Sequence, residues 1–271
     1  MLLNIVTALP SEARPLIDHF KLRREEASRL PVYASSRIRL AVSGIGKAAC
    51  ANATGFLAGS TPPGVHQAWL NIGIAGHAHA PPGTVGLAHQ IDDAATGRSY
   101  YPGIVFRSPC PSYRVKCFDM PTTTYDGDAM CDMESSAYFA AATRYSDVET
   151  VHAIKIVSDN SAAHIATIDR QRIHELISQH VDVVDDICEQ LLQVLDSTVP
   201  ADPGRENIDR LTRQWRFSVT QIIQLRELSR RWSLLRPAEP WPPLPLDGCR
   251  SARDVIHTIT SAVDTCALEI S

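Results

Sequence analysis

Three acidic residues stand at the ends of predicted helices or strands, and they are the side chains of this sequence best suited to chemistry. They are Glu12, Glu134 and Asp159. In open α/β sheets, ligands bind outside the carboxyl ends of the strands, so we expect the three carboxyl groups to meet at that edge. A carboxyl group held there can donate a proton, accept one, or face a developing positive charge.

The elements that must position these residues follow from the pattern of apolar runs. Short β-rich runs alternate with helical stretches through about the first 195 residues, which predicts an α/β layered sheet. Ser11 is the expected N-cap of the first helix. Residues 92–129 contain four prolines and predict loops and short strands. We expect strands over residues 2–9, 38–42, 68–74, 85–91 and 151–157, and helices over 11–20, 48–58, 132–145 and 170–195.

Two glycine-containing turns follow predicted strands. Residues 71–76 read Asn-Ile-Gly-Ile-Ala-Gly, and because glycine lets the backbone approach a ligand closely, we expect Ala75 and Gly76 to line a pocket. Residues 43–47 read Ser-Gly-Ile-Gly-Lys. This string lacks the earlier glycine and the following Ser or Thr of a Walker phosphate loop, so it predicts a structural strand-to-helix turn.

Together with two further motifs, these turns resemble the purine and uridine phosphorylase superfamily. The further motifs are Asp-Met-Glu-Ser-Ser-Ala at 132–137 and Ser-Asp at 158–159, after an apolar strand. The likeness is closest to the methylthioadenosine/S-adenosylhomocysteine nucleosidase branch. It runs from residue 1 to about residue 195 in the right order and spacing. It implies a nucleoside phosphorylase-like three-layer α/β fold with a mixed central β-sheet, as a catalytic domain over residues 1–196.

The resemblance also implies a role for each motif residue. Asp159 would protonate N7 of the departing purine, with Ser158 orienting it. Glu134 would hold the ribose 2′- and 3′-hydroxyls, Met133 would pack against the sugar, and Glu12 would deprotonate the attacking water. The chemistry is consistent with these roles, because glycosidic cleavage passes through an oxocarbenium-like state that needs an acid, an anion and a base.

Hydrolysis of an adenine-type nucleoside such as methylthioadenosine is therefore the first hypothesis, with no cofactor. One alternative is phosphorolysis, in which phosphate bound near Arg14 replaces water. Another is a catalytically silent nucleoside-binding regulatory module. Tyr125 would stack on the base or simply pack nearby. The resemblance further implies a homodimer or higher homo-oligomer.

Composition and charge limit the other classes of function. The net charge of -4 gives no overall attraction to nucleic acid or an anionic membrane surface. The sequence has neither a signal peptide pattern nor an apolar run near the ~20 residues of a membrane span. Its seven cysteines are scattered without a C-x-x-C motif, and His77 and His79 have no carboxylate or cysteine at ligand spacing. We expect a soluble cytoplasmic protein with reduced thiols and no metal site.

The composition changes near residue 197, where a linker-like Ser-Thr-Val-Pro-Ala-Asp-Pro-Gly stretch begins. Residues 197–271 are the expected helical C-terminal extension, with helices over 207–235 and from about 251. Between residues 205 and 236 lie eight arginines and three acidic residues. Arginine-rich helical faces are usually solvated or pair with acids of a partner subunit, so we do not expect nucleic-acid binding.

Overall fold

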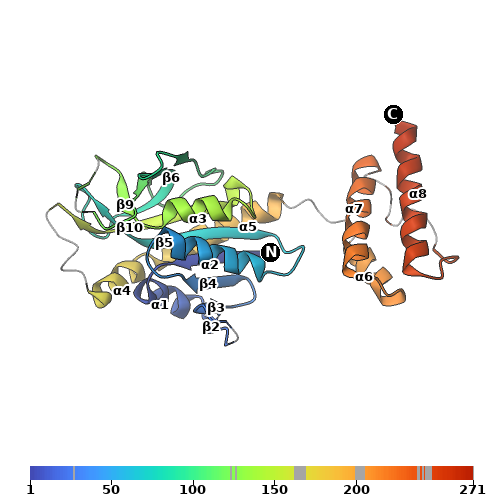
Figure 1. Ribbon diagram of the computed structural model, residues 1–271, viewed down its shortest axis with the longest axis horizontal. Coiled ribbons are helices and arrows are strands. Elements are labelled where there is room, and N and C mark those ends of the chain that lie inside the picture. Colours follow the sequence, from blue (N-terminus) through green and yellow to red (C-terminus); the bar gives the residue numbers. More distant parts are fainter. Residues whose placement is uncertain are drawn as a thin grey trace. The chain divides into compact units, whose positions relative to one another are not determined.

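The computed structural model describes residues 1–26, 28–122, 124–125, 127–161, 169–198, 205–236, 239, 241 and 246–270. The chain divides into two compact units, Met1–Thr198 and Val199–Ser271 (Figure 1). Each unit has a hydrophobic core of its own.

A ten-stranded mixed sheet forms the centre of the first unit. Its strands are β1 (Leu2–Thr7), β2 (Arg23–Arg24), β3 (Val32–Ala34), β4 (Ile38–Val42), β5 (Gln67–His77), β6 (Val85–Asp93), β7 (Ser99–Tyr100), β8 (Ser112–Cys117), β9 (Met130–Asp132) and β10 (Val151–Asn160). Strands β4, β1, β5 and β10 lie side by side and parallel. The path then continues from β10 through β6, β8 and β9 back to β5, so these five strands close a ring.

Helices cover the sheet on both faces. They are α1 (Pro10–His19), α2 (Lys47–Gly59), α3 (Ser135–Ala142), α4 (Arg170–Ser178) and α5 (Val181–Thr198), with a 3-10 turn at Val148–Thr150. Helix α2 packs against α3, whereas α1 packs against α4 and α5. On β1, Val6 belongs to the core cluster that contains α2 and α3, and its neighbour Ile5 points to the other face because side chains alternate along a strand. The predicted three-layer α/β fold with a mixed sheet is confirmed.

Buried runs of apolar residues explain why the central strands form. In β1 every residue after Leu2 is buried, and β10 is buried from Val151 through Asp159. Strands that are covered on both faces read as nearly continuous apolar runs, which made them recognisable in the sequence.

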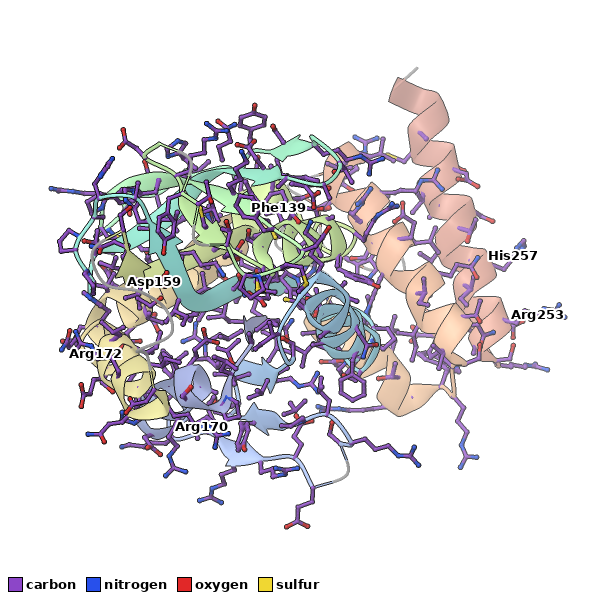
Figure 2. The ribbon with its side chains drawn as sticks, turned by 60° about the vertical axis from the view of Figure 1, so that its left-hand side comes forward. Phe139, Asp159, Arg170, Arg172, Arg253 and His257 are labelled. Carbon is purple, nitrogen blue, oxygen red and sulfur yellow. The ribbon has the colours of Figure 1, made fainter. Side chains whose placement is uncertain are left out.

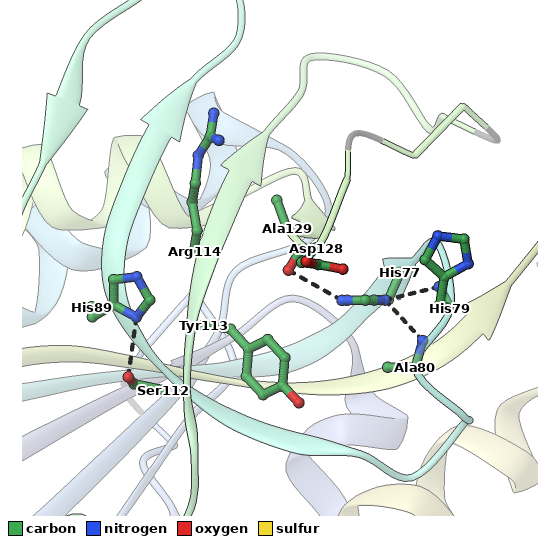
Figure 3. A pocket seen from close by; sticks show the side chains of 9 residues that line it. All are labelled: His77, His79, Ala80, His89, Ser112, Tyr113, Arg114, Asp128 and Ala129. Carbon is green, nitrogen blue, oxygen red and sulfur yellow. Dashed lines mark hydrogen bonds between the residues drawn. The ribbon is translucent and has the colours of Figure 1, made fainter.

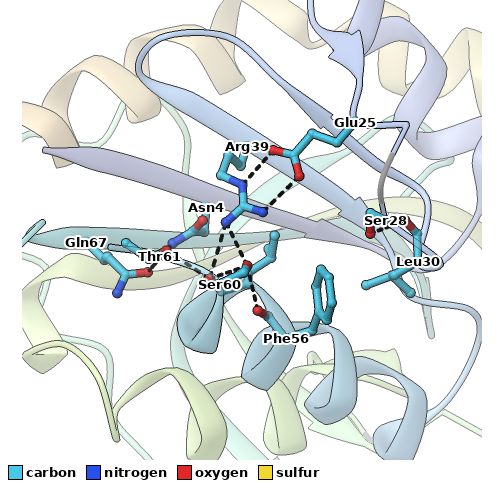
Figure 4. Close-up of polar contacts among 10 residues, drawn as sticks. Asn4, Glu25, Ser28, Leu30, Arg39, Phe56, Ser60, Thr61 and Gln67 are labelled. Carbon is cyan, nitrogen blue, oxygen red and sulfur yellow. Dashed lines mark hydrogen bonds and ion pairs between the residues drawn. The ribbon is translucent and has the colours of Figure 1, made fainter. Parts of the chain in front are cut away.

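A polar cluster ties β4 to the end of α2 (Figure 4). The guanidinium of Arg39 donates from Nε and Nη2 to the two carboxylate oxygens of Glu25, at 3.0 and 3.1 Å. Its Nη1 donates to the Ser60 hydroxyl at 3.0 Å. This bidentate pairing satisfies a nearly buried arginine on β4.

Within the first unit, the predicted N-cap of α1, start of α3 and continuity of 170–195 were wrong. The N-cap of α1 is Leu9 rather than Ser11, because Glu12 reaches back to the Leu9 amide. Helix α3 begins at Ser135, since residues 130–132 form β9. The stretch 170–195 is two helices, which separate where His180 Nε2 lies 2.7 Å from the Gly83 carbonyl oxygen.

The second unit contains α6 (Arg205–Gln214), α7 (Val219–Leu235) and α8 (Ala252–Ile270). The segment 207–235, predicted as one helix, is interrupted because Ser218 caps α7 by accepting from the Gln221 amide. The core of the second unit includes Leu225, Val255 and Ile259, all fully buried. Among the described residues of either unit, no helix is long and apolar enough to cross a membrane.

Candidate active site

A cavity of about 240 Å³ opens at the carboxyl ends of β1, β5 and β10. It lies within the first unit. Its lining residues are Ala8, Leu9, Glu12, Ile45, Ile74, Ala75, Gly76, Met120, Pro121, Thr122, Cys131, Asp132, Met133, Glu134, Ser158, Asp159 and Ile173. The three carboxylates that lie far apart in the sequence therefore face one cavity.

Glu12 is fixed between the residues that lead into α1 and strand β5, which includes the 73–76 segment predicted as a turn. Its Oε2 accepts from the Ala8 and Leu9 amides at 2.9 and 2.8 Å, and its Oε1 accepts from the Ile74 amide at 2.9 Å. The side chain is buried, and burial raises its pKa although the three amides partly oppose this. A carboxylate that is held in place and has a raised pKa accepts a proton more readily than an ordinary carboxylate.

Glu134 stands just before α3 and reaches the turn that begins α2. The Gly46 amide donates to its Oε1 at 2.7 Å. Gly46 has a φ of 98°, a conformation that favours glycine and that directs this amide toward the carboxylate. Burial and the nearby Asp132 raise the pKa of Glu134 to about 7, while Lys155 opposes the shift.

Asp159 lies at the end of β10 and is 1% exposed (Figure 2). The pairing of β10 with β5 is irregular between Val157 and Asp159, and such bulges often redirect a side chain beside an active site. The Ser158 hydroxyl donates to Oδ1 and the Tyr125 hydroxyl donates to Oδ2, both at 2.5 Å. Both carboxylate oxygens of Asp159 thus accept a hydroxyl hydrogen bond.

A buried ion pair beneath the cavity was missed by the sequence analysis. Lys155 Nζ on β10 lies 2.8 Å from Asp132 Oδ2, and the side chains are 1% and 0% exposed. Burial lowers the pKa of Lys155, but Asp132 and Glu134 outweigh it and raise that pKa above its usual range. The available signal was a lysine inside the otherwise apolar run 151–157.

The structure also places the remaining predicted site residues. Met133, Ala75, Gly76 and Ser158 line the cavity. Tyr125 contacts Asp159 through its hydroxyl.

Arg14 lies away from the cavity, contrary to the expectation that it could bind phosphate there. Its side chain is 65% exposed, and its Nε lies 2.8 Å from Asp18 Oδ2, one turn further along α1. It is not among the residues that line the cavity. We therefore propose no phosphate site at Arg14.

A second, wider cavity of about 710 Å³ is lined by three histidines, His77, His79 and His89 (Figure 3). His77 accepts at Nδ1 from the His79 and Ala80 amides, and its Nε2 lies 3.1 Å from the Asp128 carbonyl oxygen. Both ring nitrogens therefore have backbone partners, which gives His77 a structural role. Within the described ranges, no group of three His, Cys, Asp or Glu side chains could hold a metal ion.

No family model and no curated protein matches this sequence. Solved structures of 5′-methylthioadenosine/S-adenosylhomocysteine nucleosidases do match its fold. The enzyme from Campylobacter jejuni is 15% identical with a TM-score of 0.56, and the match covers 70% of this chain and 99% of that one. The enzyme from S. pneumoniae, solved with the transition-state inhibitor MT-ImmA, is 19% identical with a TM-score of 0.55, over 68% and 96% of the two chains.

The enzyme from Colwellia psychrerythraea, solved with adenine, is 16% identical with a TM-score of 0.55, over 72% of this chain and 96% of that one. At these identities the likeness establishes the fold. The predicted resemblance to the nucleosidases is confirmed at that level.

Proposed function

We propose that the chain hydrolyses the N-glycosidic bond of an adenine-type nucleoside, such as methylthioadenosine, and releases the free base. The observation that carries this proposal is the meeting of Glu12, Glu134 and Asp159 around one cavity. Solved proteins of the same fold are named as nucleosidases, and one of them holds adenine.

Each carboxyl group has a separate task in this reaction. Asp159 delivers a proton to N7, so that the base leaves as a neutral molecule. Glu134 accepts hydrogen bonds from the ribose hydroxyls, and its negative charge stabilises the oxocarbenium-like sugar. Glu12 takes the proton of the attacking water, and its three amide partners hold it in place for that task.

The charge of the cavity favours water over phosphate as the nucleophile. Its described lining residues include four acidic side chains, Glu12, Asp132, Glu134 and Asp159, and no lysine or arginine. Lys155 lies beneath the cavity, and its charge is neutralised by the ion pair with Asp132. A phosphate dianion would meet repulsion here without a cation to offset it, whereas a neutral water molecule would not.

The test is an assay of the purified full-length protein with methylthioadenosine in phosphate-free buffer. We expect adenine and a free sugar as products, at a rate that added phosphate does not change. Strict dependence on phosphate, with a sugar 1-phosphate as product, would overturn hydrolysis in favour of phosphorolysis. Absence of any cleavage, together with tight nucleoside binding, would support a binding module instead.

A further inference from the structure

Tyr125 lies against the part of the cavity that the proposed proton donor, Asp159, lines. Its hydroxyl donates to Asp159 Oδ2 at 2.5 Å. Its ring lies on Gly76, so closely that a Cβ at Gly76 would be 2.5 Å from Tyr125 Cε1. The same Cβ would be 3.0 Å from Asp159 Oδ2. Tyr125, Gly76 and Asp159 therefore leave no free space between them.

A purine that receives a proton from Asp159 needs one of its two oxygens. Oδ1 is held by Ser158, which precedes Asp159 on β10, is buried, and also lies 3.3 Å from the Ala75 carbonyl oxygen. Oδ2 is held by Tyr125, which is half-buried and belongs to the connection between β8 and β9. Of the two donors, Tyr125 is the one that a ligand can displace.

The size of the cavity also indicates that Tyr125 must be displaced. Pockets for small molecules usually measure ~300–1,000 Å³, and this cavity of about 240 Å³ lies below that range. A nucleoside therefore needs additional room. Displacement of the Tyr125 ring from Gly76 would supply it at the end of the cavity where the base must sit.

We infer that Tyr125 is a gate residue whose phenol occupies the place of the base at Asp159, so that the base enters by displacing it. The inference rests on the proposed function. Tyr125 occupies Oδ2 while the site is empty, because its hydroxyl donates to this oxygen until the base displaces it. It thereby sets the affinity for the base.

The surroundings of Tyr125 allow this movement. The beginning of the connection is anchored, because the Phe118 amide donates to the Asp132 carbonyl oxygen and Lys47 Nζ lies 2.8 Å from Asp119 Oδ1. Beyond Asp119 the described hydrogen bonds near Tyr125 are a local pair between Thr122 and Thr124 and the bond from Tyr125 to Asp159. The far end of the connection is anchored as well, because the Asp128 carbonyl oxygen lies 3.1 Å from His77 Nε2 and the Ala129 carbonyl oxygen accepts from Cys131 Sγ. Release of Tyr125 thus leaves the anchor intact.

The phenol is also suited to remain a donor. Burial and the adjacent Asp159 raise the pKa of Tyr125 above its usual range. The hydroxyl therefore keeps its proton at neutral pH, and competition between Tyr125 and the base for Oδ2 persists under assay conditions.

The test compares the wild-type protein with Tyr125→Phe, which keeps the ring on Gly76 and removes the hydroxyl. We expect KM for methylthioadenosine and the dissociation constant of adenine to fall roughly tenfold, the worth of one charge-assisted hydrogen bond, with kcat nearly unchanged. Tyr125→Met, a second variant without the hydroxyl, should behave alike. Tyr113→Phe is the matched control, because the Tyr113 ring also packs on a glycine, Gly86, but lines the other cavity.

Other outcomes overturn the inference in distinguishable ways. If kcat falls while KM is unchanged, the hydroxyl takes part in the chemistry and does not gate it. If wild-type and Tyr125→Phe proteins have the same KM and adenine affinity while both cleave methylthioadenosine, the gate is refuted and the proposed function stands. If neither protein binds adenine or cleaves a nucleoside, the proposed function fails, and the gate fails with it.

Discussion

Lys155 Nζ lies 2.8 Å from Asp132 Oδ2 in a fully buried ion pair beneath the cavity. The pair joins β10, which carries Asp159, to β9, which leads into Glu134. Asp132 is further held by the amide and hydroxyl of Ser135. One buried cation thus connects the strands that present two of the three proposed site carboxylates.

Replacing Lys155 by methionine should therefore destabilise the fold far more than replacing a surface cation. The change leaves Asp132 buried without its partner, for which we expect a loss of roughly 3–5 kcal/mol in the free energy of unfolding. Combining Lys155→Met with Asp132→Asn should restore part of the lost stability. Urea denaturation of the two single variants and the double variant measures the coupling.

A matched surface pair supplies the control for that experiment. Arg172 Nη1 and Glu175 Oε2 are 3.4 Å apart with both side chains near half exposure. We expect Arg172→Met to cost less than ~1 kcal/mol, because exposed pairs contribute little. A similarly small cost for Lys155→Met would show that the buried pair is not an important support of the site.

The central strands could be predicted from the sequence, whereas the ion pair between Lys155 and Asp132 could not. Strands such as β1 and β10 were predictable, because burial on both faces requires continuous apolar runs. The two-residue strand β2 was not, since both of its arginines are exposed and carry no periodic signal. The partner of Lys155 is 23 positions away along the chain, and no local pattern identifies it.

The candidate site was also predictable only in part. The motifs around Glu134 and Asp159 are short strings whose order predicted a shared cavity, and the structure brings them to one. The contact between Tyr125 and Asp159 depends on how the connection between β8 and β9 folds back, which its composition does not determine. Thr122 lines the cavity, whereas residues 123 and 126 lie outside the described part of the chain.

Asp159→Asn should abolish turnover and leave nucleoside binding largely intact. The amide has nearly the same shape and keeps the neighbouring hydroxyls as partners, but it cannot deliver a proton to the base. Loss of a general acid costs typically ~10²–10⁴-fold in rate, so we expect kcat to fall by at least about a hundredfold. Single-turnover assays and equilibrium binding of methylthioadenosine separate the two effects. Unchanged turnover would remove Asp159 from the acid role.

Glu134 should give the stability of the protein a specific pH dependence. Burial and Asp132 raise its pKa from 4.5 to about 7 in the folded state. Between these values the folded protein binds a proton that the unfolded chain has released, so the contribution of Glu134 to the free energy of unfolding falls as pH rises. Glu134→Gln removes this contribution. The stability of the variant relative to wild type should therefore increase from pH 4.5 to about 7 and then level off.

Urea unfolding at several pH values measures this difference. Glu175→Gln is the control, because Glu175 is on the surface of α4 and its side chain is 44% exposed. We expect a nearly constant difference for that variant. A constant difference for Glu134→Gln as well would mean that Glu134 ionises in the folded protein as it does in the unfolded chain.

Gly76→Ala should block the site without a large change in the fold. The new Cβ would meet Tyr125 Cε1 at 2.5 Å and Asp159 Oδ2 at 3.0 Å, so at least one of these groups must move. Overpacking of this kind costs about 1–3 kcal/mol. We expect kcat/KM to fall at least about tenfold, because the methyl group fills space at the proton donor.

The control for the added methyl group is Gly55→Ala in α2, where no atom lies within 4 Å of the new Cβ. There we expect unchanged turnover and a slight gain in stability of about 0.4–1 kcal/mol, since alanine restricts the unfolded chain. Gly76→Ala with wild-type kcat/KM would indicate that the base does not approach Asp159 from this side.

Leu225→Ala should destabilise the second unit and leave turnover unchanged. Leu225 is fully buried in the core that α6, α7 and α8 build among themselves, whereas every residue that lines the candidate active site belongs to the first unit. Truncation of a buried leucine costs about 2–5 kcal/mol. Leu234→Ala on the same helix is the control, because Leu234 is 75% exposed and its loss should be nearly neutral. Thermal unfolding and a methylthioadenosine assay on each variant provide the comparison, and reduced turnover in Leu225→Ala at a temperature where the first unit remains folded would show that catalysis depends on the helical unit.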